Sequence, residues 1–418
     1  MRYSNSIGNL MSIMVYLIPF ALLTGPFLPD LFCSIVAICF IYISVIEKEY
    51  KYYNSRVSIF LIMMLGYFII SSILSENIFF SLKSSLLYFR FIIFSFAVWF
   101  LIENKKNFLN IFRAFLIASF VLAIFSGFYQ FFYGETILGK TAITNRLMLL
   151  GSDRLLLGQY LARLFPLLVA LIVIKDKFDI KDYFIIFFLF ISSDVIIYLS
   201  GERTALGLML FSSIFILLLI SKLRLFRIIT LISSIIIIIF ITILNPSIKE
   251  RNIDQTINQM GLDGKNKIHL FSYEHENFYR TSIEIFKHNY LFGIGPNNFR
   301  NDCENKDYNK NTNLCSTHPH HTYFQVIAEL GLIGVIFLLL IIYYFLQIIF
   351  KHMFSILKSQ NRNLSDYQVC LICCFMCTLF PLLPSLNLFN NYINIIYYLP
   401  LGFLLHSFIQ MDSKVIKK

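Results

Sequence analysis

The sequence predicts an all-α integral membrane protein with about twelve transmembrane helices and one long periplasmic loop region. The chain has 418 residues, of which 57% are hydrophobic and only 14% are charged, and its mean hydropathy is +0.71. These values lie outside the range of soluble globular domains. Apolar runs of about 18 to 25 residues recur along almost the whole chain, the length that crosses a bilayer as a helix. The runs are continuous rather than alternating, which argues against a β-barrel.

The predicted spans fall into a group of nine followed by a group of three. Their boundaries are residues 10–28, 31–46, 57–74, 86–102, 108–126, 156–174, 183–200, 206–220, 228–244, 323–346, 367–383 and 392–410. The segments 31–46 and 206–220 are short for a full crossing. The first segment follows a single basic residue and no small-residue cleavage site follows it, so we predict a retained span rather than a signal peptide.

The orientation of the spans is predicted from the basic residues of the short loops. With the N-terminus inside, eighteen Lys and Arg residues fall on the inner side. Five fall on the outer side, namely Lys83, Lys140, Arg146, Arg154 and Arg203. We therefore predict a multi-pass membrane protein with both termini in the cytoplasm. The net charge of +11 is mostly explained by this distribution, so it does not indicate a nucleic-acid partner.

This orientation places one long soluble segment on the periplasmic side. The predicted organisation is transmembrane helices 1 to 9 in residues 1–244, a periplasmic loop domain with short helices in residues 245–322, and three further transmembrane helices and a cytoplasmic tail in residues 323–418. Within the loop domain, four apolar residues recur at helical spacing and predict a surface helix packed on the membrane domain: Tyr279, Ile283, Phe286 and Tyr290. Asn289 and the glycines of residues 293–296 are predicted to end this helix.

The cysteines form two groups with different interpretations. Cys303 and Cys315 lie in the periplasmic segment about a dozen residues apart, where an oxidising compartment favours a disulfide that shortens the lead into the next span. The alternative is a pair of free thiols. The second group lies at helical spacing inside one apolar run: Cys370, Cys373, Cys374 and Cys377. We interpret these as packing residues, because one straight helix does not wrap four thiolates around a metal ion.

Several arginines lie inside or beside predicted spans, where a charge is costly and suggests function. They are Arg90, Arg154, Arg163, Arg203 and Arg280. Arg203 is the strongest candidate and lies in SGERTALG at the outer junction of two spans. The planar guanidinium group suits a phosphate or diphosphate. The alternatives are an internal ion pair, such as Arg203 with Glu202, or a side chain that extends to the membrane interface.

Three histidines stand immediately before the tenth predicted span, where water meets the membrane: His318, His320 and His321. We interpret them as a functional cluster with His320 at its centre, because an imidazole titrates near neutral pH. Glu329 follows about two helical turns later and is predicted to orient the cluster or to line its cavity. The alternative for each histidine is a solvated loop residue. Zinc binding is not favoured, because the sequence HPHH lacks a matched set of Cys or carboxylate ligands.

Three of these motifs, in their order along the chain, resemble the O-antigen ligase and polymerase superfamily of polytopic membrane glycosyltransferases. SGERTALG around Arg203 resembles the arginine motif of that family. Residues 279–299 resemble its outer-loop arginine helix, which ends in a Gly-x-Gly turn, and residues 318–334 resemble its histidine motif. The twelve-span plan also agrees with the family. The cysteine pair before HPHH resembles that of a ligase subgroup.

The resemblance implies an O-antigen ligase that transfers polysaccharide from undecaprenyl diphosphate to lipid A core or another glycan acceptor on the periplasmic face. The expected catalytic residues are His320, Arg203 and Arg280, and the expected substrate-binding residues are Arg154, His318, His321, Glu329 and Arg90. Arginines that stabilise the diphosphate leaving group need no metal or other cofactor. His320 would take the proton of the acceptor hydroxyl or only position the acceptor. Direct displacement would invert the anomeric carbon.

Other functions also agree with these motifs. A polymerase would join undecaprenyl-linked repeat units, and a protein O-oligosaccharyltransferase would glycosylate a periplasmic protein. A flippase or transporter of lipid-linked oligosaccharide belongs to a different class. It would show a polar lining through the membrane midplane and internal repeats. In this sequence the charged residues gather on the outer side, and we find no repeat.

Overall fold

The computed structural model describes residues 2–141, 146–175, 177–262, 268–309, 314–358 and 361–415, and the side chains of these ranges between residues 6 and 408. Within these ranges the regular structure is helical, apart from one isolated β-bridge between Glu135 and Thr141. The predicted all-α class is therefore confirmed.

The helices follow the predicted apolar segments closely. In chain order they are α1 Arg2–Thr24, α2 Phe27–Ile46, η1 Tyr50–Tyr53, α3 Arg56–Ile73, α4 Ile78–Leu86, α5 Phe89–Asn104, α6 Phe108–Tyr133, α7 Leu157–Val173, α8 Ile180–Leu199, α9 Arg203–Leu219, α10 Arg224–Leu244, α11 Pro246–Lys249, η2 Glu250–Asp254, α12 Gln255–Gln259, α13 Tyr273–His288, α14 Phe299–Asp302, α15 Thr322–Leu357, α16 Asp366–Thr378 and α17 Asn391–Val415. Each of the twelve predicted segments falls on one of these helices.

Not all of these helices are long enough to cross a membrane alone. In the described ranges, eight helical stretches have the required length and apolar character, with α4 and α5 taken as the single stretch Ile78–Asn104. Helices α7, α9 and α16 are apolar but shorter. The protein is thus a helical multi-pass membrane protein, and the count of twelve spans stays a prediction.

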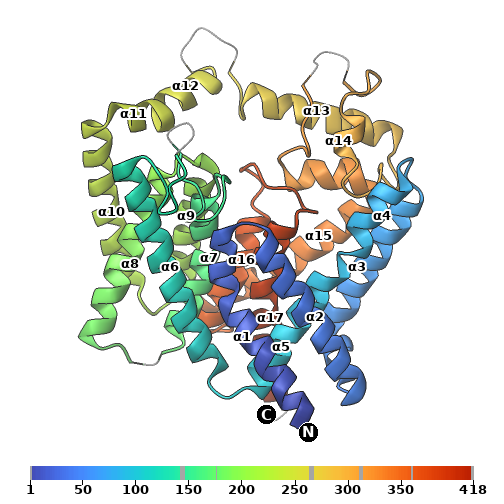
Figure 1. Ribbon diagram of the computed structural model, residues 1–418, viewed down its shortest axis with the longest axis horizontal. Helices are drawn as coiled ribbons and strands as arrows, with labels where there is room; N and C mark the ends of the chain where they lie inside the picture. The colour runs from blue at the N-terminus through green and yellow to red at the C-terminus, as the bar shows by residue number, and fades with distance from the viewer. Residues whose placement is uncertain are drawn as a thin grey trace.

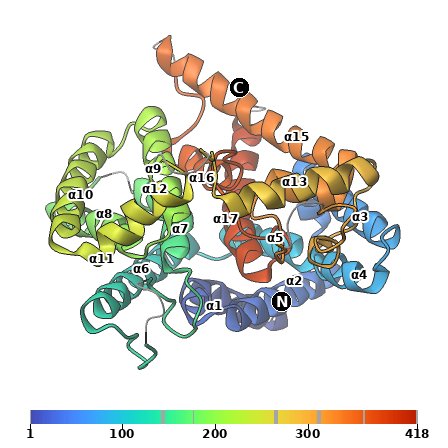
Figure 2. The same ribbon diagram turned by 90° about the horizontal axis from the view of Figure 1, so that it is seen from above.

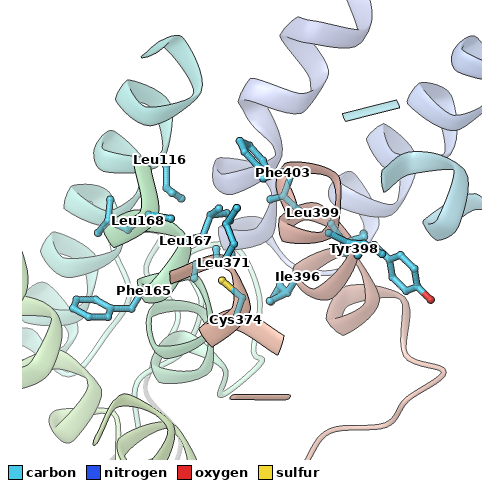
Figure 3. Packing of buried hydrophobic residues seen from close by; sticks show 14 of the residues in the cluster. Leu116, Phe165, Leu167, Leu168, Leu371, Cys374, Ile396, Tyr398, Leu399 and Phe403 are labelled. Atoms are coloured by element: carbon cyan, nitrogen blue, oxygen red, sulfur yellow. The ribbon is translucent and has the colours of Figure 1, made fainter. Parts of the chain in front are cut away.

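Helix α7 forms the centre of the bundle. Every one of its residues is buried, and it packs against α6, α8, α9 and α16. Figure 3 shows Leu167 and Leu168 of α7 beside Leu371 and Cys374 of α16, with Ile396 of α17 next to them. The four cysteines of α16 are buried in this core, which agrees with their interpretation as packing residues.

Two buried ion pairs account for arginines inside the bundle. Arg90 of α5 contacts Asp30 of α2 at 2.8 Å, and Arg227 of α10 contacts Asp194 of α8 at 2.9 Å. The Arg227 side chain is 1% exposed. In the orientation prediction it was one of the eighteen basic residues assigned to the inner side. A buried arginine needs such a partner, because an isolated charge in a low-dielectric interior is strongly unfavourable.

One end of the bundle is covered by residues 245–321, and we call it the loop end (Figure 1). Both chain termini lie at the opposite end (Figure 1). Seen from above, α11 and α12 lie over the side of α8, α9 and α10, whereas α13 lies over the side of α15 (Figure 2). The placement of both termini in the cytoplasm stays a prediction.

The surface helix of the loop region is present as α13, but its packing face differs in part from the predicted one. Ile283 is 39% exposed and Tyr290 is 60% exposed, whereas Phe278, Ser282 and Ile285 are buried. The predicted face is confirmed at Tyr279, which is 5% exposed and stacks on Phe324 of α15 at 4.2 Å. It is wrong at Ile283 and Tyr290, because large apolar residues were assumed to mark the contact. In the structure a small residue, Ser282, lies in the face packed on α15, and its hydroxyl donates to the Phe278 carbonyl at 2.8 Å.

After α13, the chain makes a turn at residues 291–296 that docks against a break in α15. Gly331 interrupts α15 with φ 61° and ψ −159°, so backbone groups near the break are available to the turn. The Ile294 N–H donates to the Ala328 carbonyl at 3.0 Å, and the Gly295 N–H donates to the Glu329 carbonyl at 2.9 Å. We call this contact the turn-to-break contact.

Glycine is required on both sides of the turn-to-break contact. A Cβ atom on Gly293, which has φ +70°, would lie 2.4 Å from the Glu329 carbonyl carbon. A Cβ atom on Gly331 would lie 2.6 Å from the Gly293 nitrogen. Tyr67 of α3 donates its hydroxyl to the Leu330 carbonyl at the same place. The loop region is therefore fixed to the membrane helices by backbone contact at van der Waals range.

We predict that Gly293→Ala lowers the thermal stability of the folded protein more than Gly134→Ala does. Gly134 has a similar φ of +73°, but a Cβ atom added there would meet none of the described atoms within 4 Å. Both variants incur a strain of about 1–2 kcal/mol from an L residue at positive φ, and Gly293→Ala adds an overpacking cost of about 1–3 kcal/mol. Unfolding midpoints of the two purified variants in detergent would measure the difference. Equal midpoints would contradict the turn-to-break contact.

Candidate active site

The HPHH motif forms the turn that leads into α15. His320 adopts a left-handed backbone conformation with φ 58°, which is uncommon for a residue other than glycine. The Ser385 N–H stabilises this conformation by donating to the His320 carbonyl at 2.8 Å. Strained backbone of this kind clusters at functional sites. The turn directs the His320 imidazole toward α13 rather than into the helix that follows.

Three imidazoles meet at this turn. The ring centroids of His318 and His320 are 4.0 Å apart, and His275 of α13 lies 5.3 Å from His320. The Nε2 atom of His320 is 3.0 Å from the Ser316 hydroxyl. The Nε2 atom of His318 is buried without a hydrogen-bond partner among the described residues. We call His275, His318 and His320 the histidine cluster.

His321 is oriented differently from the histidine cluster. Its Nε2 atom lies 3.0 Å from the Pro381 carbonyl oxygen. It donates a hydrogen bond to this oxygen in the tautomer that carries the proton on Nε2. Its ring packs between Tyr279 and Phe324, at centroid distances of 5.3 and 5.1 Å. These contacts place His321 between α13 and α15, where it helps to hold the two helices together.

The histidine cluster is uncharged at neutral pH. Burial, together with the neighbouring His275, lowers the pKa of His320 to about 4. Burial, followed by the neighbouring His320, lowers the pKa of His318 to about 3. Desolvation disfavours the imidazolium form, and a second imidazolium beside the first is repelled. At pH 7 each ring therefore has one nitrogen that accepts a hydrogen bond or a proton.

A second group at the loop end consists of three arginines around the SGERTALG motif. Arg146 and Arg251 flank Gly201: a Cβ atom there would lie 3.3 Å from Cγ of each. Burial, followed by the charges of Arg146 and Arg203, lowers the pKa of Arg251. The Nε atoms of Arg146 and Arg251 are buried and have no hydrogen-bond partner in the part of the chain that the structure describes. We call Arg146, Arg203 and Arg251 the arginine cluster.

No ion pair joins Arg203 to Glu202 in the described structure, although the two residues are adjacent. The Arg203 Nη2 atom donates to Gln259 of α12 at 2.7 Å. The Glu202 side chain instead accepts from the Gly158 N–H at 2.8 Å. Burial raises the pKa of Glu202 to about 8 despite the opposing charge of Arg146. Glu202 is therefore largely protonated at neutral pH and leaves the positive charge of the arginine cluster uncompensated.

Contacts through α12 and α13 join the two clusters. Arg203 contacts Gln259, and the carbonyl of the next residue, Met260, accepts from the His269 N–H at 2.9 Å. The His269 ring contacts Glu276 of α13, which follows His275, and His275 is in ring contact with His320. These contacts bring Arg203 and His320, which are separated by 117 positions in the chain (320 − 203), to one region of the loop end.

The other two predicted arginines of the outer face lie apart from these clusters. Arg280 is exposed on α13. It is five residues after His275, which is about 140° around a helix, so the two side chains project from different faces. Arg154 is exposed in the loop before α7. The structure brings neither guanidinium group into contact with the histidine cluster.

Arg90 and Glu329 have structural contacts that explain their burial. Arg90 is occupied by its ion pair with Asp30. Glu329 accepts from the Phe299 N–H at 3.1 Å and from the Gln325 side chain at 2.9 Å. It thereby joins α14 to α15 next to the turn-to-break contact. These contacts are structural and do not support substrate binding. The substrate-binding roles of Arg90 and Glu329 stay predictions.

Arg163 belongs to the interior of the bundle. Its side chain is buried in α7, where Nε donates to the Gln159 Oε1 atom at 2.9 Å. Its guanidinium group lies over the Tyr397 ring, 5.4 Å from the centroid. A cation over an aromatic face is stabilised by the ring quadrupole. The described contacts of Arg163 are thus with neutral groups inside the bundle, and a functional role for it stays a prediction.

Cys303 and Cys315 are joined by a disulfide, with their Cα atoms 5.3 Å apart. Cys303 follows α14 and is fully buried. Cys315 directly precedes Ser316, the residue whose hydroxyl contacts His320. The disulfide therefore restricts the segment that positions Ser316, beyond shortening the lead into the HPHH motif.

Three residues of the clusters, His275, Arg146 and Arg251, were not predicted as site residues. His275 stands alone among polar residues of α13, and a single histidine at the start of a surface helix carries no pattern. Arg146 was counted only as an outer-loop charge, and Arg251 lies just after the ninth predicted span. One sequence feature could have indicated them: all three are basic or titratable residues in segments that were predicted on the same side of the membrane as Arg203.

One part of the chain matches a known protein family. Residues 185–339 match the family described as O-antigen ligase. The match covers 155 of the 418 residues, so it relates this segment, rather than the whole chain, to the O-antigen ligase family. The matched segment contains Arg203, Arg251, His275 and the HPHH motif, so the resemblance seen in the motifs is confirmed. A search of curated proteins found no match.

The family match indicates a general type of activity. The match supports a glycosyltransferase-like enzyme of the O-antigen ligase and polymerase type, a type that acts on polysaccharides and lipids. The apolar helices of the chain make it a multi-pass membrane protein. The clusters described above lie at the loop end.

We predict that acid destabilises the protein partly through His318. Its pKa is about 3 in the folded protein and 6.5 when the side chain is solvated, so the neutral form stabilises the fold above pH 6.5 and this contribution is lost as pH falls toward 3. The loss follows the slope of one titrating group, about 1.4 kcal/mol per pH unit below 6.5. Unfolding midpoints at pH 7 and 4.5 would measure it.

The matched variants are His318→Gln and His288→Gln. His318→Gln removes the titrating group and should show a smaller fall in midpoint between the two pH values than the unsubstituted protein. His288 is exposed at the end of α13, so His288→Gln should leave the fall unchanged. An unchanged fall in His318→Gln would show that His318 is not held neutral by burial.

Proposed function

We propose that the protein is an O-antigen ligase, which transfers polysaccharide from undecaprenyl diphosphate to a hydroxyl of lipid A core on the periplasmic face of the bacterial inner membrane. The observation that carries the proposal is that the arginine cluster and the histidine cluster both lie at the loop end, joined by contacts through α12 and α13, with Arg203 and His320 inside the segment that matches the O-antigen ligase family. One cluster suits a diphosphate leaving group, and the other suits an attacking hydroxyl.

The arginine cluster supports binding of the diphosphate. Its three guanidinium groups, including the buried Nε atoms of Arg146 and Arg251, provide donors in a region without an ionised carboxylate at Glu202. Hydrogen bonds between arginine and phosphate oxygens are charge-assisted and directional. The cluster also stands at the first residue of α9, where the helix dipole favours an anion. These groups would stabilise the charge that develops on the departing diphosphate.

The histidine cluster supports activation of the acceptor. In the proposed step, the acceptor hydroxyl oxygen forms a bond to the anomeric carbon, and the bond from that carbon to the diphosphate oxygen breaks. The electron pair of the broken bond leaves on the diphosphate, and the hydroxyl proton passes to a nitrogen of His320. Direct displacement from the opposite side inverts the anomeric configuration. His318 and Ser316 would keep the His320 ring in place.

Donor binding would increase the basicity of His320. With a pKa of about 4, His320 accepts a hydrogen bond well but is a weak proton acceptor at neutral pH. A diphosphate bound at the arginine cluster places negative charge near the histidines, and an opposite charge favours the imidazolium form. The pKa of His320 would therefore rise toward neutrality only when the donor is bound, which would couple proton transfer to an occupied donor site.

Arg280 and Arg154 remain part of the proposal. The resemblance assigns Arg280 to catalysis, and both residues have exposed guanidinium groups outside the membrane core. We propose that they contact the donor or the glycan chain when substrate is bound. His321 and Glu329 would act by positioning the turns that present the histidine cluster.

We predict that His320→Ala and Arg203→Ala abolish transfer while protein remains in the membrane, and that Arg146→Ala and Arg251→Ala lower its rate about 10- to 100-fold. The 10- to 100-fold range corresponds to the loss of one hydrogen bond to a charged group, which contributes about 1.5–3 kcal/mol. Transfer of radiolabelled polysaccharide to lipid A core by membrane vesicles would measure it. Lys249→Ala, which removes an exposed charge on neighbouring α11, is the control and should retain full activity.

Wild-type transfer in His320→Ala or Arg203→Ala would defeat the site assignment. Equal losses in Lys249→Ala and Arg251→Ala would show that general positive charge, rather than the arginine cluster, is required.

We predict that a strain lacking this protein accumulates long polysaccharide chains on the carrier lipid and has none on lipid A core. Gel profiles of surface polysaccharide with carrier-lipid extraction would test this. The control is the same strain complemented with the intact protein. Single repeat units attached to lipid A core would instead identify a polymerase, and an unchanged profile with loss of a periplasmic glycoprotein would identify a protein O-oligosaccharyltransferase.

A further inference from the structure

A polar pocket at the loop end is not explained by the two clusters. It has a volume of about 260 Å³ and lies where the turn between α1 and α2 meets α14 and the start of α17. Its lining includes the four asparagines Asn297, Asn387, Asn390 and Asn391, together with Arg300 and Tyr392. We call it the asparagine pocket. Such a density of amide groups is unusual beside apolar spans and calls for a polar ligand.

The amides of the asparagine pocket are held in place by hydrogen bonds. The Asn387 Oδ1 atom accepts from the Gln325 side chain at 2.7 Å and from the Phe389 N–H at 2.9 Å. Its Nδ2 atom donates to the Asn297 Oδ1 atom at 3.1 Å. Gln325 in turn donates to Glu329. The buried side of the pocket is therefore rigid and continuous with the turn-to-break contact.

Two buried polar atoms of the pocket residues lack partners within the described ranges. They are the Nε atom of Arg300 and the hydroxyl of Tyr392, whose residue is only 3% exposed. Arg300 Nη2 donates to the Asn297 Oδ1 atom at 2.7 Å, which fixes the guanidinium group at the pocket wall. Unsatisfied buried donors are costly. A bound molecule with an anionic oxygen at the pocket wall would satisfy the Arg300 Nε atom.

We infer that the asparagine pocket binds the acceptor glycan through one sugar ring that carries hydroxyl groups and a phosphate or carboxylate. Each amide offers two donors and a carbonyl acceptor, which matches hydroxyls that both donate and accept. Arg300 supplies the charge for the anionic substituent. The volume is below the roughly 300–1,000 Å³ of sites for drug-sized ligands, so it suits about one sugar ring.

The position of the pocket favours the acceptor over the donor. The pocket adjoins the histidine cluster, because Asn387 lies two residues after Ser385, whose N–H donates to the His320 carbonyl at 2.8 Å. On the other side of the pocket, Arg300 lies three residues before Cys303, whose disulfide to Cys315 holds the segment of Ser316, the contact of His320. The arginine cluster is assigned to the donor diphosphate under the proposed function, on which this inference rests. The asparagine pocket then remains for the glycan that brings the attacking hydroxyl.

Chemical protection of a cysteine placed in the pocket would test binding without any transfer reaction. Asn390 is exposed at the pocket rim, and Asn390→Cys would be labelled with a membrane-impermeant maleimide in vesicles of the full-length protein. The probe is the phosphorylated core oligosaccharide released from lipid A by mild acid. We expect it to slow labelling at least fivefold. Asn258→Cys, at an exposed position of α12, is the control and should be labelled at an unchanged rate.

The arms of this experiment separate the possible ligands. The labelling is repeated with the oligosaccharide after its phosphates are removed, and again after its carboxylates are reduced. The form that no longer protects the cysteine identifies the anionic group that Arg300 binds. Inorganic phosphate alone tests whether the pocket is a simple anion site. Loss of protection in only one of the two modified forms supports the inference. Equal protection by both modified forms overturns the role of Arg300. Protection by inorganic phosphate alone, protection of Asn258→Cys, or no protection by any probe overturns the glycan site.

A kinetic experiment separates this inference from the proposed function. In the transfer assay, Asn390→Phe should raise the KM for acceptor at least tenfold and leave the KM for donor unchanged, because the larger side chain fills the pocket. Asn258→Phe is the size-matched control and should change neither constant. A raised KM for donor alone, or no change, would overturn the acceptor assignment. Protection of Asn390→Cys in a protein without transferase activity would contradict the proposed function while retaining the glycan site.

Discussion

The contact between the 291–296 turn and the break in α15 is the constraint on which the site depends. It joins backbone to backbone, since Ile294 and Gly295 donate to carbonyls of α15 beside Gly331. Backbone contact at this range has little freedom to shift, because side chains that would adjust are absent from both glycines. Helix α13 precedes the turn and α14 follows it, so both are positioned by the same contact. Each then supplies residues near the histidines: His275 from α13 and Arg300 from α14.

The electrostatics of the loop end follow from burial. The histidines are neutral because an imidazolium is poorly solvated there, and Glu202 is largely protonated because burial raises its pKa. The arginines, in contrast, keep their charge even when partly buried. The loop end therefore carries fixed positive charge beside neutral bases, without an ionised carboxylate at Glu202. This combination favours an anionic substrate group and at the same time leaves nitrogen lone pairs available to a hydroxyl.

Local sequence patterns identified some of the site residues and missed others. Arg203 and His320 were identified because each lies at the boundary of an apolar run, where a charge or an imidazole has a cost that is visible in the sequence. Arg90 was identified by the same criterion, yet the structure pairs it with Asp30 from a helix 60 positions earlier in the chain. Whether a boundary charge has a partner depends on which helices become neighbours. His275 and Arg146 carry no boundary signal and became evident only through proximity.

The sequence by itself determined the helical class, the twelve apolar segments and the cysteine pair, because hydrophobic length and spacing act locally along the chain. It also determined that histidines begin α15, whereas α13 ends at His288, before the glycines that were predicted to end it. Tertiary structure alone decided the packing face of α13, the grouping of Arg146, Arg203 and Arg251, and the asparagine pocket. The physical reason is that these features require elements distant in sequence to approach within a few ångströms. Between the segment after α13 and α15, Gly293 and Gly331 permit that approach, and their neighbours in space are not their neighbours in sequence.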